Sequence, residues 1–243
     1  MTDWARHWER FPLQFAPTDF LRQVGKTLGG VPISERQVER IVAGIHEALQ
    51  LRDEDVVLDL CCGNGLLTER IARSCRSVVG VDYSSSLLAV AERHHRPANV
   101  SYRLLSALDL DRLRPAPPIL FTKVLVYEAL QHFHPRALGR LLEGIGGVTT
   151  PDARVLLGSV PDRALRRRFH DTPRRRLIAL MRRLAGRDAI GTWWDREVLR
   201  SVLERSGWNC VFMDQPPELH TAHYRFDLAA ERIPTGWRGK VER

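Results

Sequence analysis

Short apolar runs alternate with amphipathic helical patterns along most of the chain. Helical patterns fall at about 35–50, from Leu66, from Ser85, at about 135–146 and at about 195–207. Strands that alternate with helices are typical of a doubly wound, mostly parallel α/β sheet. Because a short loop joins the last two strands, we expect the seventh strand to be antiparallel. The seven runs of strand length and composition are "VVLDL", "SVVGVD", "VSYRLL", "ILFTKVLVY", "ARVLLGSV", "WNCVFMD" and "YRFDLAAE".

The length of 243 residues fits a single domain over 1–243. Residues 1–50 mix aromatic and polar side chains, and we expect them to form an N-terminal helical lid. A segment rich in arginine, at about 161–192, follows the fifth strand and predicts a helical insertion there. The sequence shows no signal-peptide pattern and no apolar run long enough to span a membrane. These features favour a cytoplasmic protein.

Charge and cysteine content narrow the range of partners. The formal net charge is +8, but arginine supplies 34 of the 37 basic residues, a bias more typical of a GC-rich genome than of polyanion binding. We therefore expect no nucleic-acid partner. The four cysteines show no metal-type spacing, so the sequence predicts reduced thiols and no metal site.

The segment "VVLDLCCGNGLLTERIA", residues 56–72, contains a glycine turn between a strand and a helix. A dinucleotide-binding turn has the pattern G-x-G-x-x-G, but Thr68 occupies the place of the third glycine. The alternative is a turn that holds S-adenosylmethionine against Gly63 and Gly65. Asp82 ends the next strand, where one carboxylate accepts from both ribose hydroxyls of either cofactor. Asp82 thus indicates an adenosine site without identifying the cofactor.

The motifs "VLDLCCGNG", "VVGVDYS" and "VLVYEALQHF" resemble those of class I S-adenosylmethionine-dependent methyltransferases. "DLCCGNG" is especially similar to the small-molecule branch, which includes ubiquinone and menaquinone methyltransferases. The resemblance implies a Rossmann-like fold and S-adenosyl-L-methionine as the cofactor. The implied cofactor-binding residues are Asp59, Cys61, Gly63 and Gly65 in the turn, Asp82 and Tyr83 at the ribose and adenine, Ser106 and Ala107 at the adenine edge, and Gln23 and Lys26 in the lid.

Histidines near the expected carboxyl edge of the sheet are the candidates for a catalytic base. His132 follows the fourth strand, and an ordinary histidine pKa suits proton removal from a hydroxyl near neutral pH. His220 and His223, in the loop before the last strand, are the reserve candidates. A pH profile that rises with an apparent pKa near 6 to 7 is expected if any of the three acts as base.

We therefore expect methylation of a hydroxyl on a small molecule or a glycan. Three alternatives stay open: carbon methylation of a quinone-like ring, methylation of RNA, and a non-catalytic binding module that keeps the fold. The fourth strand lacks both the N-P-P-Y-type segment of amino-group enzymes and the Pro-Cys nucleophile of cytosine enzymes. The sequence determines neither the acceptor nor the oligomeric state.

Overall fold

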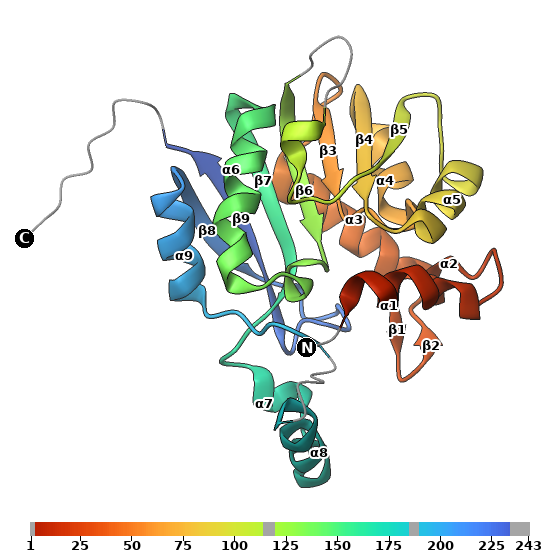
Figure 1. Ribbon diagram of the computed structural model, residues 1–243, viewed down its shortest axis with the longest axis vertical. Helices are drawn as coiled ribbons and strands as arrows, with labels where there is room; N and C mark the ends of the chain where they lie inside the picture. The colour runs from red at the N-terminus through yellow and green to blue at the C-terminus, as the bar shows by residue number, and fades with distance from the viewer. Residues whose placement is uncertain (1–2, 114–119, 185–189, 234–243) are drawn as a thin grey trace, which may run out of the picture.

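A seven-stranded mixed sheet forms the centre of the molecule in the computed structural model, which describes residues 3–113, 120–184 and 190–233 (Figure 1). The strand order is β5-β4-β3-β6-β7-β9-β8. Strand β9 pairs antiparallel with both β7 and β8, while β3, β4, β5, β6 and β7 pair in parallel. The seven strands are β3 (Val56–Leu60), β4 (Ser77–Asp82), β5 (Val100–Leu104), β6 (Phe121–Tyr127), β7 (Thr149–Pro161), β8 (Trp208–Asp214) and β9 (Arg225–Arg232).

Helices cover both faces of the sheet. One face packs against α3 (Glu35–Leu49), α4 (Leu66–Ile71) and α5 (Ser85–His94), and the other against α6 (Leu138–Val148) and α9 (Arg196–Arg205) (Figure 1). All five residues of β3 are buried, as expected for a central parallel strand with helices on both sides. The predicted α/β fold with an antiparallel last strand is confirmed.

The segment before α3 lies beyond the carboxyl ends of the parallel strands (Figure 1). It contains α1 (Trp4–Arg10), a 3-10 turn (Pro12–Gln14), α2 (Phe20–Gln23) and a hairpin of β1 (Thr27–Leu28) and β2 (Val31–Pro32). The sequence predicted a helical lid over residues 1–50 and no strand where the hairpin lies. Two-residue strands are too short to leave a period-two pattern, so nothing in the local sequence indicates them.

The predicted helical insertion follows β7, the fifth strand of the sheet. It contains α7 (Arg166–Phe169) and α8 (Pro173–Leu184). Helix α8 extends away from the body of the molecule at the same edge that α1 crosses (Figure 1). Both N-terminal and inserted segments thus gather at the edge where open α/β sheets bind their ligands.

Candidate active site

A cavity of about 350 Å³ opens at the carboxyl edge of the parallel strands. Its walls come from segments far apart in the sequence: α1, the segment before β1, and the loops that follow β3, β4, β5 and β6. The residues from the strand loops include Asp59, Cys61, Cys62, Gly63, Asn64, Asp82, Tyr83, Ser106, Ala107, Glu128 and His132. The topology therefore brings most of the predicted cofactor residues to one site.

The two glycines of the turn after β3 have different roles. Gly63 (φ +58°) lines the cavity, and its backbone N–H donates to Oδ2 of Asp82 at 2.9 Å. Gly65 (φ +79°) does not line the cavity, and a Cβ atom there would stand 2.3 Å from Oη of Tyr102. We expected both glycines to face the cofactor. The structure corrects this for Gly65, which lets the turn pack closely against β5.

Two buried carboxylates, Asp59 and Asp82, line the cavity beside the turn. Asp59 accepts from Oγ1 of Thr68 at 2.6 Å, and burial raises the pKa of Asp59 to about 7. Asp82 accepts from the backbone N–H groups of Gly63 and Ser84, and burial raises its pKa as well. Nearby negative charge adds to the cost of ionising Asp59. A ligand that brings positive charge and hydroxyl donors would relieve this repulsion.

The thiols near the carboxylates are not nucleophiles. Burial and the neighbouring carboxylates raise the pKa of both Cys61 and Cys62 well above its usual value. Cys61 has a φ of +59°, an unfavourable backbone conformation for a residue other than glycine. Both residues line the cavity as neutral, compact side chains.

Tyr83, Ser106 and Ala107, which the sequence predicted to contact the adenine, all line the cavity. Oη of Tyr83 donates to the backbone carbonyl of Trp4 at 3.1 Å, so this ring is held by α1. Oγ of Ser106 accepts from the backbone N–H of Leu108 at 3.2 Å. The hydroxyl of Ser106 thus closes its own turn.

Helix α1 covers the cavity, and sequence reasoning assigned no role to its aromatic residues. Trp4 and Trp8, one helical turn apart, both line the wall. The backbone carbonyl of Trp8 accepts from Oγ of Ser84, and the carboxylate of Glu9 accepts from the backbone N–H and hydroxyl of Ser85. These contacts fasten α1 to the start of α5. The i, i+4 spacing of two tryptophans was the available sequence signal.

The two lid residues predicted to reach the ligand have different positions. Gln23 is buried but does not line the cavity, because its amide donates to the carbonyls of Ala16 and Pro17 and accepts from Asn64. Nζ of Lys26 does line the cavity and lies 2.6 Å from Oε2 of Glu128. Direct contact of Gln23 with a ligand is therefore not supported by its geometry.

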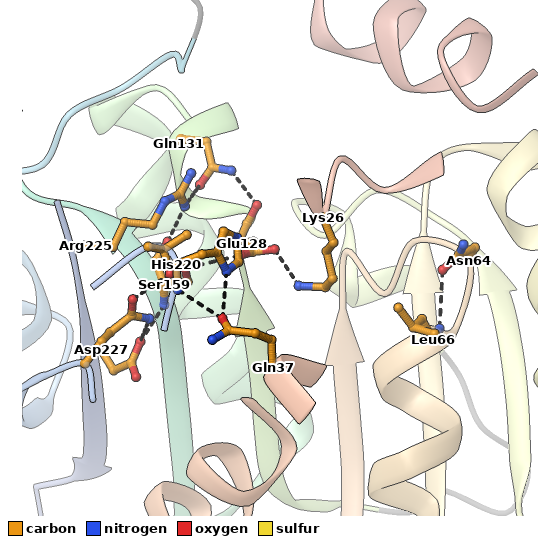
Figure 2. Close-up of polar contacts among 12 residues, drawn as sticks. Lys26, Gln37, Asn64, Leu66, Glu128, Gln131, Ser159, His220, Arg225 and Asp227 are labelled. Carbon is orange, nitrogen blue, oxygen red and sulfur yellow. Dashed lines mark hydrogen bonds and ion pairs between the residues drawn. The ribbon is translucent and has the colours of Figure 1, made fainter. Parts of the chain in front are cut away.

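Glu128 follows β6 with a φ of +53°, which turns the chain at the floor of the cavity. Lys26 reaches it from one side, while Arg225 and His220 lie on the other side (Figure 2). Despite burial, the charges of Lys26 and Arg225 hold the pKa of Glu128 at about 2. Glu128 is thus an anion at neutral pH and a poor proton acceptor.

His132 belongs to a 3-10 turn, Leu130–His132, and its ring forms part of the cavity wall. The indole N–H of Trp8 donates to Nε2 at 3.2 Å, which places the imidazole proton on Nδ1. Within the part of the chain that the structure describes, Nδ1 has no hydrogen-bond partner. Burial, with a smaller effect of Arg225, lowers the pKa to about 3. The structure therefore corrects the expected titration near pH 6 to 7, and His132 is neutral at physiological pH.

His220 and His223 do not share the cavity of His132. They line a second cavity of about 530 Å³, together with the β1–β2 hairpin, Tyr224 and one side of α8. Nδ1 of His220 lies 3.3 Å from Oε1 of Gln37, and burial lowers the pKa of His220. The charge of Glu128 acts on His220 in the opposite direction. Lys26 and Glu128 therefore lie close to the boundary between the two cavities.

Metal coordination has no support in the described ranges 3–113, 120–184 and 190–233. No group of three or more His, Cys, Asp or Glu side chains gathers there in a way that could hold an ion. The same ranges contain no helix long and apolar enough to cross a membrane.

Comparison with known proteins identifies the domain. Residues 57–152, from β3 to the start of β7, match the family model described as "Methyltransferase domain". This segment is similar to a methyltransferase domain, in agreement with the resemblance found in the sequence. The predicted enzyme class and the predicted cofactor, S-adenosyl-L-methionine, agree with this match.

Curated relatives match part of this chain. The ubiquinone biosynthesis O-methyltransferase of Methylococcus capsulatus is 38% identical over 77 residues, 31% of this chain and 31% of that protein. The 23S rRNA (uracil(1939)-C(5))-methyltransferase of Aeromonas hydrophila is 34% identical over 98 residues, 40% of this chain and 20% of that protein. The chain thus spans a third or less of the length of these two relatives.

A solved structure supports the fold over nearly the whole chain. The N-methyltransferase NodS from Bradyrhizobium japonicum, in complex with S-adenosyl-L-homocysteine, aligns with a TM-score of 0.63 at 16% identity. The alignment covers 96% of this chain and 100% of that one. At this identity the likeness establishes the Rossmann-like architecture and leaves the acceptor open.

The cavity residues fit the cofactor on chemical grounds. S-adenosylmethionine carries a sulfonium and an ammonium charge, and both would be favoured beside Asp59 and Asp82. Asp82 has oxygen lone pairs left for the ribose hydroxyls after its two backbone bonds. A side chain on Gly63 would project toward Val24 in the same wall, with its Cβ 3.2 Å from Cγ1 of Val24. Because Gly63 has no side chain, this part of the cavity stays open for the cofactor.

Proposed function

We propose that this protein is a cytoplasmic methyltransferase that methylates a hydroxyl oxygen of a small molecule or a glycan. The observation that carries the proposal is the neutral, buried imidazole of His132 in the wall of the cofactor cavity. A hydroxyl must lose its proton as the new bond to the methyl group forms. His132 lines the cavity with an unprotonated Nε2, although its pKa of about 3 makes it a weak base. A hydroxyl oxygen that is gaining a methyl group becomes far more acidic than a free hydroxyl, so its proton can pass to Nε2 as the bond forms.

The bound cofactor supplies an activated methyl group for an in-line displacement. The protein's own contribution is alignment of the reacting atoms and exclusion of water. Trp4 and Trp8 perform the second task, since their rings cover the cavity from α1. Because α1 is held by hydrogen bonds to Ser84 and Ser85, it has to release them for the cofactor to enter.

Proton transfer to His132 requires one local rearrangement. Nε2 accepts from Trp8 in the closed state, so it has to give up this bond to accept a proton from a hydroxyl. The hydroxyl would take the place of the indole N–H as the hydrogen-bond donor, so Nε2 keeps a donor throughout. The imidazole would then carry protons on both nitrogens and release one to water after the product leaves.

The acceptor would approach from the second cavity. Its lining combines apolar side chains of α8 and the hairpin with the guanidinium groups of Arg175 and Arg182. This combination suits a molecule with an apolar body and an anionic group. Lys26 and Glu128 lie between this cavity and the methyl donor, where they could position the acceptor hydroxyl.

Carbon methylation of an aromatic ring is the second candidate. The aromatic lining of the cofactor cavity, with Trp4, Trp8, Tyr83 and Phe133, would suit a planar acceptor. Such a reaction depends less on a base, so we would expect a smaller loss of activity when His132 is replaced.

One experiment separates these functions. The purified protein is incubated with S-adenosylmethionine labelled with carbon-13 in the methyl group and a library of small hydroxylated and phenolic acceptors. The carbon-13 shift of the transferred methyl reports whether it is bound to oxygen, carbon or nitrogen. An oxygen-linked methyl supports the proposal. A carbon-linked methyl would establish the second candidate instead.

A further inference from the structure

An ordinary surface helix turns its apolar side toward the protein. Helix α8 instead has arginines on the side toward the protein and an apolar side toward the solvent. The side that lines the second cavity carries Arg175, Ile178, Ala179 and Arg182. The apolar residues Leu177, Leu180, Met181 and Leu184 have the same spacing, two residues further along the chain. Since two residues turn an α-helix by about 200°, this second set lies on the opposite side.

The outward side of α8 is exposed and apolar. The exposed fractions are 59% for Leu177, 51% for Leu180, 64% for Met181 and 81% for Leu184. Leu28 and Val31, on the β1–β2 hairpin beside the second cavity, are 65% and 66% exposed. Figure 1 shows α8 and the hairpin extending from the same edge of the molecule. Water-exposed apolar side chains at this density mark a surface that is covered by something else.

Charge around this surface indicates what covers it. Helix α8 contains arginine at 174, 175, 176, 182 and 183 and no acidic residue. Arg174 and Arg176 lie in its first turns, near the level of Leu177. A helix with an apolar stripe between arginines, exposed at the rim of a protein, has the composition of a helix that lies in the interface of an anionic membrane.

We propose that α8 docks this protein on the surface of an anionic lipid bilayer. The helix would lie in the plane of the interface, with Leu177, Leu180, Met181 and Leu184 among the acyl chains and the arginines at the headgroups. Leu28 and Val31 would enter the same layer from the hairpin. The second cavity is lined by the other side of α8, so it would lie on the protein side of the docked helix. The docking does not depend on which atom the enzyme methylates.

Vesicle sedimentation tests this proposal with the full-length protein. Phosphatidylcholine vesicles with and without phosphatidylglycerol are mixed with wild type and with the double variant Met181→Asp, Leu184→Asp. Wild type should bind the anionic vesicles, and added salt should weaken the binding. The double variant should bind roughly tenfold or more weakly, because two apolar side chains no longer enter the bilayer. Arg174→Gln should weaken binding roughly fivefold.

The matched control is Val198→Asp, Val211→Asp, which places the same charges on exposed apolar positions of α9 and β8. This variant should bind as wild type does. Failure of wild type to bind anionic vesicles would overturn the proposal, as would wild-type binding by the Met181, Leu184 variant. Light scattering that shows a dimer dissociated by the same variant, without vesicle binding, would assign the surface to a second copy instead.

Discussion

The indole N–H of Trp8 donates to Nε2 of His132 across 124 residues of sequence, at a distance of 3.2 Å. This bond joins α1 to the turn that follows β6. It closes the cavity and at the same time determines which imidazole nitrogen carries the proton. Opening of the cavity and release of Nε2 of His132 as a proton acceptor therefore both require this hydrogen bond to break.

Replacement of His132 tests its role as base. His132→Gln keeps an acceptor for Trp8 but cannot take up a proton, so turnover should fall roughly 100-fold. Cofactor affinity should stay within about twofold of wild type, because the lid contact is retained. Steady-state kinetics and calorimetry check the two quantities. Activity of the glutamine variant close to wild type would show that His132 only positions α1.

The pH profile provides a second test of His132. Since burial holds its pKa at about 3, it should contribute no ascending limb between pH 5 and 8. An ascending limb near pH 6 to 7 that survives in His132→Gln would move the base to His220 or His223. A profile of kcat against pH for both proteins distinguishes these cases.

Asp59 should make the ligand-free protein less stable as the pH rises. Its pKa is about 7 in the folded protein, above the ordinary value of 3.8. Because the folded pKa is raised, Asp59 makes its full contribution to the free energy of unfolding below about pH 3.8. This contribution is lost as the pH rises through 7. At pH 8, Asp59→Asn should thus be more stable than wild type by on the order of 2 kcal/mol. At pH 5 this difference between the variant and wild type should be smaller. Equal differences at the two pH values in urea unfolding would contradict this account.

The two glycines of the turn should respond differently to alanine. Gly65→Ala should lower the free energy of unfolding by about 2–4 kcal/mol, because its Cβ would meet Tyr102 and its φ is positive. Gly63→Ala should mainly weaken cofactor binding, and Gly63→Val should abolish it. Gly139→Ala, in α6 with open space around the new Cβ, is the control and should not be destabilising. Equal stability loss at 63 and 65 would refute the division of roles.

The Lys26–Glu128 pair should contribute to stability through charge compensation. Lys26→Met leaves Glu128 buried without its ammonium partner and should cost about 1–3 kcal/mol. The double variant Lys26→Met, Glu128→Gln should recover much of this loss. The contribution of Glu128 is present above about pH 4.5 and lost as the pH falls toward its folded pKa of about 2. Denaturant unfolding of wild type, the single variants Lys26→Met and Glu128→Gln, and the double variant measures the coupling, and simple additivity would contradict it.

The strands, the helices and the carboxylates Asp59 and Asp82 could be predicted because each leaves a local pattern. Apolar runs of five to seven residues identify buried strands, and an acidic residue at a strand end is visible without tertiary information. The glycine turn was also visible. The different roles of Gly63 and Gly65 were not visible, because the role of Gly65 depends on its contact with Tyr102, which lies on β5.

Contacts of long sequence separation could not be predicted. Trp8 meets His132 and Lys26 meets Glu128 only because α1 and the hairpin fold back over the carboxyl edge. The low pKa of His132 follows from this covering, so sequence reasoning could supply only the ordinary value. His220 and His223 lie near the same edge, yet they line the second cavity, a separation that only the fold determines.

We expect the cavity beneath α1 to bind S-adenosylmethionine through Asp82. Isothermal titration of wild type and Asp82→Ala with S-adenosylhomocysteine and with NADH measures this dependence. We predict micromolar binding of S-adenosylhomocysteine by wild type, a loss of about 1–3 kcal/mol in the variant, and no binding of NADH by either. Unchanged affinity of Asp82→Ala for S-adenosylhomocysteine, or binding of NADH in its place, would contradict the account.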